Sequence, residues 1–242
     1  MFSKYKNKYF SVLGDSASTF EGCSEPEYAA YYDTAHKLAS GVLTRADTWW
    51  GQVIDSLGGE LLVNNSFSGS TVCWHPAFEI PSYGCSNERT SSLGRDGISP
   101  DVIMVYMGMN DWGHGFRVRG DERYDSGINN PTLFLTAYSS MLTKLRINYP
   151  NAEIWCFTLP ISRCSAEQDF KFPYYFGGRH IGEYCEAIRE CAAEDGCRLI
   201  DLYHSMDAYD TVDEFHPSAD GMNAIAEGVM RELQARLSDN VQ

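Results

Sequence analysis

Basic residues are scarce in this sequence relative to acidic ones. The 242 residues include 19 Lys and Arg against 33 Asp and Glu, which gives a formal net charge of −14 at pH 7. No cluster of Lys or Arg interrupts this excess of negative charge. A field of this sign repels nucleic acids and anionic membrane surfaces. The composition therefore argues against a nucleic-acid or membrane partner.

Long apolar segments are also lacking. The longest apolar run, around residues 102–109, is too short to cross a bilayer. The first ten residues carry charges with no apolar segment behind them, so they do not form a secretory signal. We therefore expect a soluble, cytoplasmic protein, provided that no residues before Met1 were removed. Its oligomeric state cannot be read from the sequence.

Metal-binding and cofactor-binding patterns are missing as well. The eight cysteines form no Cys-x-x-Cys pair and no cluster with histidine at zinc-site spacing. We therefore expect no metal, and free buried thiols in a reducing compartment rather than a disulfide framework. No phosphate loop of the Walker or Rossmann type is present, and residues 16–22 only faintly imitate the phosphate-binding segment of a flavin site. We expect no cofactor.

What is present is an alternation of strands and helices. Short apolar runs with the profile of buried parallel strands occur at residues 9–13, 61–64, 101–107, 153–159 and 198–202. Helical spacing follows at residues 47–57, 131–150, 181–191 and 218–237. Asp47 is expected to cap the first of these helices, and Pro131 to occupy the first turn of the second. The pattern predicts an α/β fold, with a five-stranded parallel sheet and helices on both faces, in a single domain spanning residues 1–242.

The first predicted strand ends in Gly14-Asp15-Ser16. Glycine allows a sharp turn, and Asp and Ser favour turns and helix caps. Such a turn places the Ser16 hydroxyl at the carboxyl edge of the sheet, where open α/β sheets bind their ligands. Ser16 is therefore either a candidate nucleophile or simply a cap of the next helix.

A candidate base lies near the other end of the chain. A serine hydroxyl needs a neighbouring base to take its proton. Asp213 and His216 are three residues apart, so in a turn the carboxylate can reach one ring nitrogen and leave the other free to face Ser16. The alternative is that Asp213 caps a helix and His216 is a surface residue.

Acyl transfer also needs hydrogen-bond donors for the oxygen that becomes negative. The backbone N–H of Gly69 and the side chain of Asn110 both follow predicted strands, and the Ser16 N–H is a third candidate donor. Taken singly, Gly69 and Asn110 are equally well explained as turn residues.

Together, four blocks resemble the SGNH (GDSL-type) hydrolases, a family of serine esterases and lipases. The blocks are GDS at 14–16, the glycine at 69 in NNSFSGS, GMND at 108–111 and DEFHP at 213–217. The resemblance implies a flavodoxin-like three-layer α/β/α sandwich and ester hydrolysis without a metal. It also implies Ser16 as nucleophile, Ser16, Gly69 and Asn110 as oxyanion donors, and Asp213 with His216 as the acid–base pair.

Aromatic and basic residues in the predicted edge loops indicate the substrate. Trp74, Trp112 and Tyr174, beside Arg163, suit a sugar ring better than an acyl tail. We therefore expect a small acyl group, such as acetyl, on a carbohydrate or similar polar alcohol, with water as the second reactant. The alternatives are that these aromatics pack the loops together, that the enzyme is a lysophospholipase or thioesterase, or that the fold is a non-catalytic carbohydrate-binding module.

Overall fold

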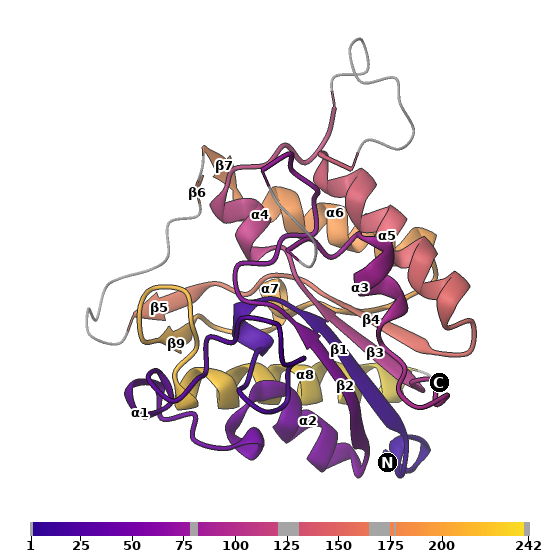
Figure 1. Ribbon diagram of the computed structural model, residues 1–242, viewed down its shortest axis with the longest axis vertical. Coiled ribbons are helices and arrows are strands. Elements are labelled where there is room, and N and C mark those ends of the chain that lie inside the picture. Colours follow the sequence, from indigo (N-terminus) through magenta and orange to yellow (C-terminus); the bar gives the residue numbers. More distant parts are fainter. Residues whose placement is uncertain (1, 78–81, 121–130, 165–174, 177, 240–242) are drawn as a thin grey trace.

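A five-stranded parallel sheet forms the centre of the protein, in a computed structural model that describes residues 2–77, 82–120, 131–164, 175–176 and 178–239. The strand order is β2-β1-β3-β4-β8, and every neighbouring pair is parallel (Figure 1). The strands are β1 (Tyr9–Gly14), β2 (Glu60–Ser66), β3 (Val102–Tyr106), β4 (Glu153–Phe157) and β8 (Arg198–Ile200). The predicted fold class and strand number are confirmed.

Helices cover both faces of this sheet. In Figure 1, α2 (Trp49–Leu57) and α8 (Ala219–Asp239) lie below the sheet, and α5 (Phe134–Asn148) and α6 (Ile181–Glu194) lie above it. Shorter elements fill the connections: η1 (Ser3–Tyr5), η2 (Ser16–Ser18), α1 (Lys37–Ser40), η3 (Arg45–Asp47), α3 (Asn87–Ser91), α4 (Met109–Gly113), α7 (Leu202–Ser205), and the small strands β5 (Ser162–Cys164), β6 (Tyr175–Phe176), β7 (Arg179–His180) and β9 (Tyr209–Thr211).

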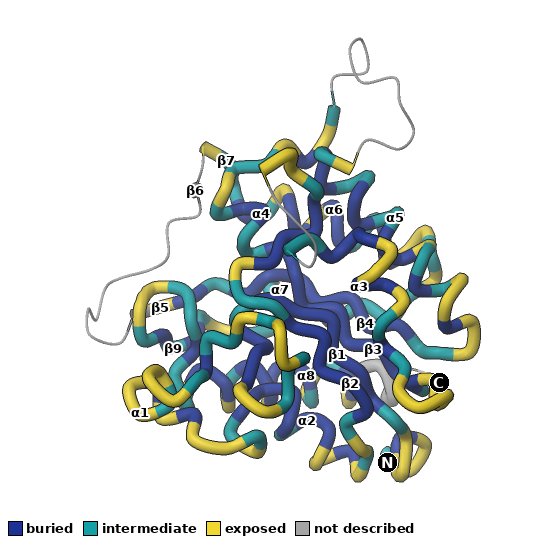
Figure 2. The backbone as a smooth tube through the Cα atoms, viewed as in Figure 1, coloured by how far each residue is buried: buried dark blue, intermediate teal, exposed yellow. Residues whose placement is uncertain are grey.

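The central strands are buried on both sides, which explains why they are apolar without alternation. Val12 and Met104 pack into the core between the sheet and helices α2 and α8. Their neighbours Leu13 and Val105 pack into the core between the sheet and helices α5 and α6. All four side chains are fully buried, and Figure 2 shows the same burial along the central strands. A parallel sheet covered on two faces needs apolar residues at successive positions.

Two helix starts differ from the sequence prediction. Thr48 rather than Asp47 caps α2, because its hydroxyl oxygen accepts a hydrogen bond from the Gly51 N–H at 3.0 Å. Asp47 instead closes a capping box in the preceding η3. Helix α5 begins at Phe134, so Pro131 lies in the turn before the helix and not in its first turn.

Two further observations concern the chain as a whole. The seven cysteines whose side chains are described are free, as expected, and five of them are buried. In the part of the chain that the structure describes, none of the helices combines the length and the apolar character needed to cross a bilayer.

Candidate active site

The turn after β1 is closely packed around Gly14. A Cβ atom at this position would lie 2.6 Å from the Cβ of Ser18 and 2.7 Å from the Oγ of Ser66, so no larger residue fits. Asp15 follows, and its carboxylate accepts a hydrogen bond from the Ala17 N–H at 3.1 Å, which caps η2. The half-buried Ser16 is the first residue of η2 and therefore sits at the carboxyl edge of the sheet.

The ends of β2 and β3 are tied together by Asn110 and Asp111 in α4. The Asn110 side-chain nitrogen donates to the Ser70 carbonyl oxygen at 2.9 Å. The Asp111 carboxylate accepts hydrogen bonds from the N–H groups of Val72 and Cys73, at 2.7 and 2.9 Å. Asp111 therefore joins α4 to the loop that follows β2.

The loop before α8 wraps around the carboxylate of Asp213. Its Oδ2 atom lies 2.7 Å from the Nδ1 atom of His216, and its Oδ1 atom accepts the backbone N–H groups of Phe215 and His216. Glu214 adopts a positive φ of 80°, which lets the backbone turn this tightly. Burial alone raises the pKa of Asp213, but the hydrogen bonds from His216 outweigh burial and hold that pKa below its ordinary value.

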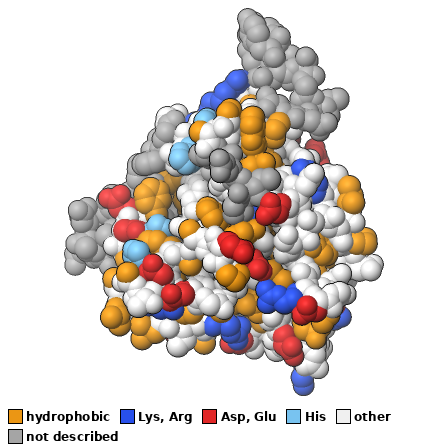
Figure 3. Space-filling view, viewed as in Figure 1, with side chains coloured by type: hydrophobic (Ala, Val, Ile, Leu, Met, Phe, Trp, Pro, Cys, Tyr) orange, Lys and Arg blue, Asp and Glu red, His pale blue; other side chains and the backbone are white. Residues whose placement is uncertain are grey.

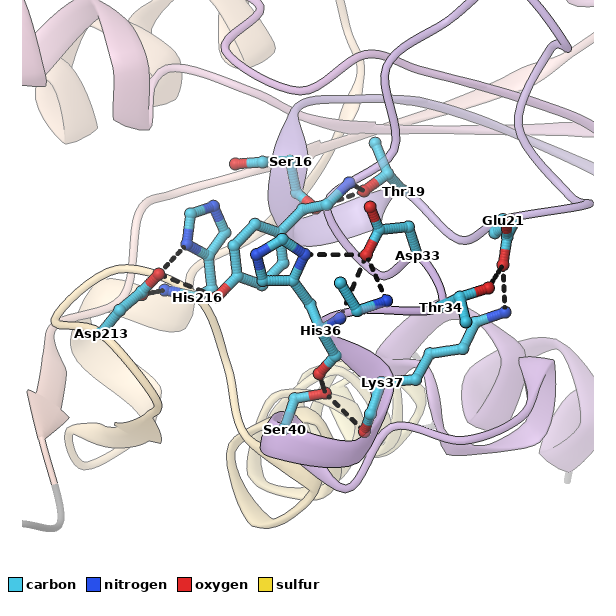
Figure 4. A network of polar contacts seen from close by, with 12 residues as sticks. Ser16, Thr19, Glu21, Asp33, Thr34, His36, Lys37, Ser40, Asp213 and His216 are labelled. Carbon is cyan, nitrogen blue, oxygen red and sulfur yellow. Dashed lines mark hydrogen bonds and ion pairs between the residues drawn. The ribbon is translucent and has the colours of Figure 1, made fainter.

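Ser16, Asn110 and His216 line one cavity of about 260 Å³, although they come from three distant segments. Tyr106, Met109 and Phe215 supply much of its apolar lining. In Figure 4 the Ser16 hydroxyl lies on the side of the His216 ring that faces away from Asp213. Among the described residues no hydrogen bond links the hydroxyl to the ring, as is common before substrate binds.

A larger hollow of about 760 Å³ lies beside α6 and contains none of these three residues. Its arginines pair with neighbouring acids, for example Arg119 with Glu190 and Arg179 with Glu183. Because these charges are already paired, we assign the chemistry to the smaller cavity.

The family model for GDSL-like lipases and acylhydrolases matches residues 8–161, which is more than half of the chain. The chain belongs to this family. The expected resemblance is therefore confirmed. The match contains the Ser16, Gly69 and Asn110 blocks, whereas Asp213 and His216 lie beyond it.

Solved structures show the same fold over nearly the whole chain. A crystal structure from Bacteroides uniformis, assigned to the GDSL-like lipases, is 30% identical, covers 95% of this chain and 96% of its own, and has a TM-score of 0.69. A second one, from Bacteroides ovatus, is 26% identical, covers 95% and 99%, and has a TM-score of 0.71. Est24, a carbohydrate acetylesterase from Sinorhizobium meliloti, is 14% identical over 95% and 99% with a TM-score of 0.62, and at that identity it shows the fold alone. No curated protein matches the sequence significantly.

Three other predicted site residues of this GDSL-family chain, Gly69, Trp74 and Trp112, are not among the residues that line the cavity. Gly69 is exposed, with a φ of 80°, and precedes Ser70, the residue that Asn110 contacts. Trp74 is half-buried and packs against the core above the sheet. Trp112 is 1% exposed, and its indole donates to the Arg179 carbonyl oxygen, so its ring cannot stack on a sugar.

Arg163, the basic residue predicted to lie in the sugar site, already has an acidic partner. Arg163 in β5 pairs with Asp210 in β9 at 3.2 Å, and it is not among the residues that line the cavity. Tyr174 lies outside the described residues.

Arg89 is a residue of the site's framework that sequence reasoning missed. Although fully buried, it donates to the Gly14 carbonyl at 3.0 Å, the Asn65 carbonyl at 2.8 Å and the Ser70 hydroxyl at 2.8 Å. It thereby joins the ends of β1 and β2. Burial lowers the pKa of Arg89 to about 10, which still leaves it charged at neutral pH.

Two buried carboxyl groups also have unusual acidity. Burial raises the pKa of Asp15 to about 7, with a further contribution from the charge of Asp111. Burial likewise raises the pKa of Asp111 to about 6, although the hydrogen bonds from Val72 and Cys73 oppose the rise. Burial therefore favours the neutral form of the carboxyl beside Ser16.

Proposed function

We propose that the protein is a serine esterase that cleaves carboxylic esters through an acyl-enzyme intermediate. The observation that carries the proposal is the shared cavity: Ser16 and His216 both line it, and Asp213 holds the other side of the His216 ring at 2.7 Å. A hydroxyl, an imidazole and a carboxylate in this order form the arrangement used for nucleophilic acyl transfer.

In the proposed mechanism, His216 removes the proton of Ser16 as the serine oxygen attacks the ester carbonyl. Asp213 keeps the Nδ1 atom protonated, so that the Nε2 atom is the one that accepts. The resulting imidazolium then protonates the leaving alcohol, which leaves the acyl group on Ser16. Water attacks the acyl-enzyme by the same route and releases the acid.

Three donors are proposed to stabilise the oxyanion. Asn110 lines the cavity, and its side-chain NH₂ group gives one hydrogen to the Ser70 carbonyl, which leaves the second for substrate. The Ser16 N–H and the Gly69 N–H complete the proposed set. The φ of 80° at Gly69 is a conformation that glycine adopts at no steric cost.

The size of the cavity supports a small acyl group. Its volume of about 260 Å³ lies just below the range of about 300–1,000 Å³ that is typical of small-molecule sites. We propose an acetyl-sized acyl group on a carbohydrate or similar polar alcohol. Among the described aromatics predicted to contact the sugar, only Trp74 keeps exposed surface, since Trp112 is buried.

The first experiment is labelling with a fluorophosphonate probe, which reacts only with an activated serine. We expect the wild-type protein to be labelled and Ser16→Ala to remain unlabelled. Labelling that persists in Ser16→Ala, or a wild-type protein that never labels, contradicts the proposal and favours a non-catalytic binding module.

A second experiment tests the acyl group. Rates of hydrolysis of acetyl and octanoyl esters of the same alcohol should favour the acetyl ester, because the cavity has little room for a long chain. A preference for the octanoyl ester instead identifies a lysophospholipase-type or thioesterase-type activity.

A further inference from the structure

Tyr31 contacts both members of the proposed acid–base pair. Its ring stacks on the His216 ring, with 3.4 Å between centroids and an angle of 7° between the planes. Its hydroxyl donates to the Oδ2 atom of Asp213 at 2.8 Å, the same oxygen that His216 contacts. We infer that Tyr31 is a positioning residue for the proposed esterase reaction, one that fixes the Asp213 carboxylate and stabilises the imidazolium form of His216. The inference thus rests on the function proposed above.

The backbone of Tyr31 is also tied to the proposed nucleophile. The Tyr31 N–H donates to the Thr19 hydroxyl oxygen at 2.8 Å, and the Thr19 hydroxyl donates to the Ser16 carbonyl oxygen at 2.8 Å. The adjacent Tyr32 is buried, and its hydroxyl donates to the Pro217 carbonyl oxygen at 2.8 Å. The loop before α1 therefore connects the serine segment to the histidine segment.

The hydroxyl of Tyr31 completes the set of donors around Asp213. Oδ1 of that carboxylate takes two backbone N–H groups, and Oδ2 takes the His216 ring and the Tyr31 hydroxyl. Burial, followed by the bond to Asp213, raises the pKa of Tyr31, so the hydroxyl stays a donor at every pH at which the enzyme would work. Four donors hold the carboxylate in one orientation.

The ring of Tyr31 acts on charge. The face of an aromatic ring carries negative electrostatic potential and attracts a cation placed over it. His216 becomes a cation only while it holds the Ser16 proton, so this contact is stronger in the transition state than before reaction. The hydroxyl has the opposite effect, because its bond to Asp213 weakens the attraction of that carboxylate for the imidazolium.

A second histidine stacks on Tyr31 from the other side. The His36 ring lies 4.6 Å from the Tyr31 ring at 28°, and it pairs with Asp33 at 2.8 Å (Figure 4). Two rings this close to one centroid cannot share a face without overlapping, so His36 and His216 occupy opposite faces. His36 is exposed, so solvent screens the electrostatic interactions of its ring.

The charged and titratable groups around His216 are few in the described part of the chain. Asp213 and Tyr31 touch the ring. The titratable groups that line the same cavity are Asp15, Tyr106, His114 and Tyr209. Figure 3 shows histidine side chains close to acidic ones on the side of the molecule where α1 and β9 lie. Because Tyr31 is uncharged, replacing it removes the ring contact to His216 without changing the charge of the site.

Two variants separate the effects of the hydroxyl and the ring. Tyr31→Phe keeps the ring and removes the bond to Asp213, so the midpoint of the acid limb of the kcat/KM profile should move to higher pH. Tyr31→Leu removes the ring as well, so its midpoint should lie about half a pH unit or more below that of Tyr31→Phe. Turnover of the Leu variant should fall on the order of two- to tenfold relative to the Phe variant.

The control is His36→Ala, which removes the outer ring and should leave the midpoint within about 0.2 pH unit of wild type, because the contact is longer and solvated. Equal midpoints for wild type, Tyr31→Phe and Tyr31→Leu overturn the inference. An equal shift in His36→Ala also overturns it, since loop packing would then explain the result. If Tyr31→Leu does not fold, the upward shift of the midpoint in Tyr31→Phe still tests the role of the Tyr31 hydroxyl.

A readout without turnover separates this inference from the proposed function. In the Ser16→Ala background, NMR titration of the isotope-labelled His216 ring reports the same midpoint shifts in the two Tyr31 variants. Wild-type protein that fails to react with the fluorophosphonate refutes the esterase. If the wild-type protein does react with the fluorophosphonate but the Ser16→Ala titrations show no shift in the Tyr31 variants, the role of Tyr31 alone is refuted.

Discussion

Asn110 illustrates how one side chain can serve both structure and chemistry. One hydrogen of its amide holds the Ser70 carbonyl, and the other is available in the cavity that Ser16 and His216 line. Asp111, the next residue, keeps α4 attached to the loop after β2 through backbone N–H groups. The framework around Asn110 therefore has support that does not depend on Asn110 itself.

Replacement of Asn110 by alanine should lower kcat on the order of a hundredfold, because the loss of one oxyanion donor typically costs about 3 kcal/mol. The free energy of unfolding should change by only about 1 kcal/mol, the value of one ordinary hydrogen bond. Steady-state kinetics and urea denaturation measure the two effects. Asn148→Ala is the matched control, since its amide also donates to a backbone carbonyl, of Thr90 at 3.0 Å, away from the cavity. An unchanged kcat in Asn110→Ala removes this residue from the mechanism.

For single residues, the sequence predicts a functional role when the partner of the residue lies only a few positions away in the chain. Gly14, Asp15 and Ser16 are adjacent, and Asp213 and His216 are three apart, so the local pattern is visible. Tyr31 has no such pattern, because its partner Asp213 is 182 residues away. Trp112 shows the opposite error. As an aromatic residue in a polar loop it is predicted to bind substrate, but its ring is part of the buried core.

At the scale of elements, the five strands and four long helices follow from apolar runs and helical spacing. The ends of elements are less predictable, because several candidate caps compete. Asp47 and Thr48 are both good caps, and in the structure Thr48 receives the Gly51 N–H whereas Asp47 closes the capping box of η3. The small strands β5 and β9 could not be predicted, since each is three residues long and depends on a partner far along the chain.

Arg89 joins elements rather than residues. Its guanidinium satisfies the carbonyls of Gly14 and Asn65 and the hydroxyl of Ser70, at the ends of β1 and β2. Arg89→Met should lower the free energy of unfolding by about 3 kcal/mol, because each buried polar group left without a partner costs about 1–3 kcal/mol. Urea denaturation measures the loss. Arg95→Met, which removes an exposed pair with Glu25, should cost less than about 1 kcal/mol. Equal losses in the two variants show that Arg89 does not join the strands as proposed.

For the whole molecule, the sequence predicts a large negative charge but not which carboxylates are buried. Among the described residues, the buried acidic side chains are Asp15 and Asp111, and both lie at the cavity edge of the sheet. The single-domain organisation of residues 1–242 stays a prediction. Burial of two carboxyl groups makes the stability of the fold depend on pH in a direction opposite to that of a surface ion pair.

The pKa of Asp15 is raised from 3.8 to about 7 by burial, so between these values the folded state holds a proton that the unfolded state has lost. The contribution of Asp15 to stability is thus fully present below the unfolded pKa and is lost as pH rises toward 7. Asp15→Asn keeps an acceptor for the Ala17 N–H but cannot ionise. The free energy of unfolding of Asp15→Asn, measured relative to that of wild type, should therefore rise by about 1–2 kcal/mol from about pH 5 to about pH 7. Asp101→Asn is the control: Asp101 has a lowered pKa and pairs with Lys8, which stays charged between about pH 5 and about pH 7, so its effect is confined to pH below about 4 and its curve should run parallel to that of wild type across the same window. Chemical denaturation at several pH values compares the three proteins, and a parallel curve for Asp15→Asn would show that Asp15 is already ionised in the folded protein at pH 5.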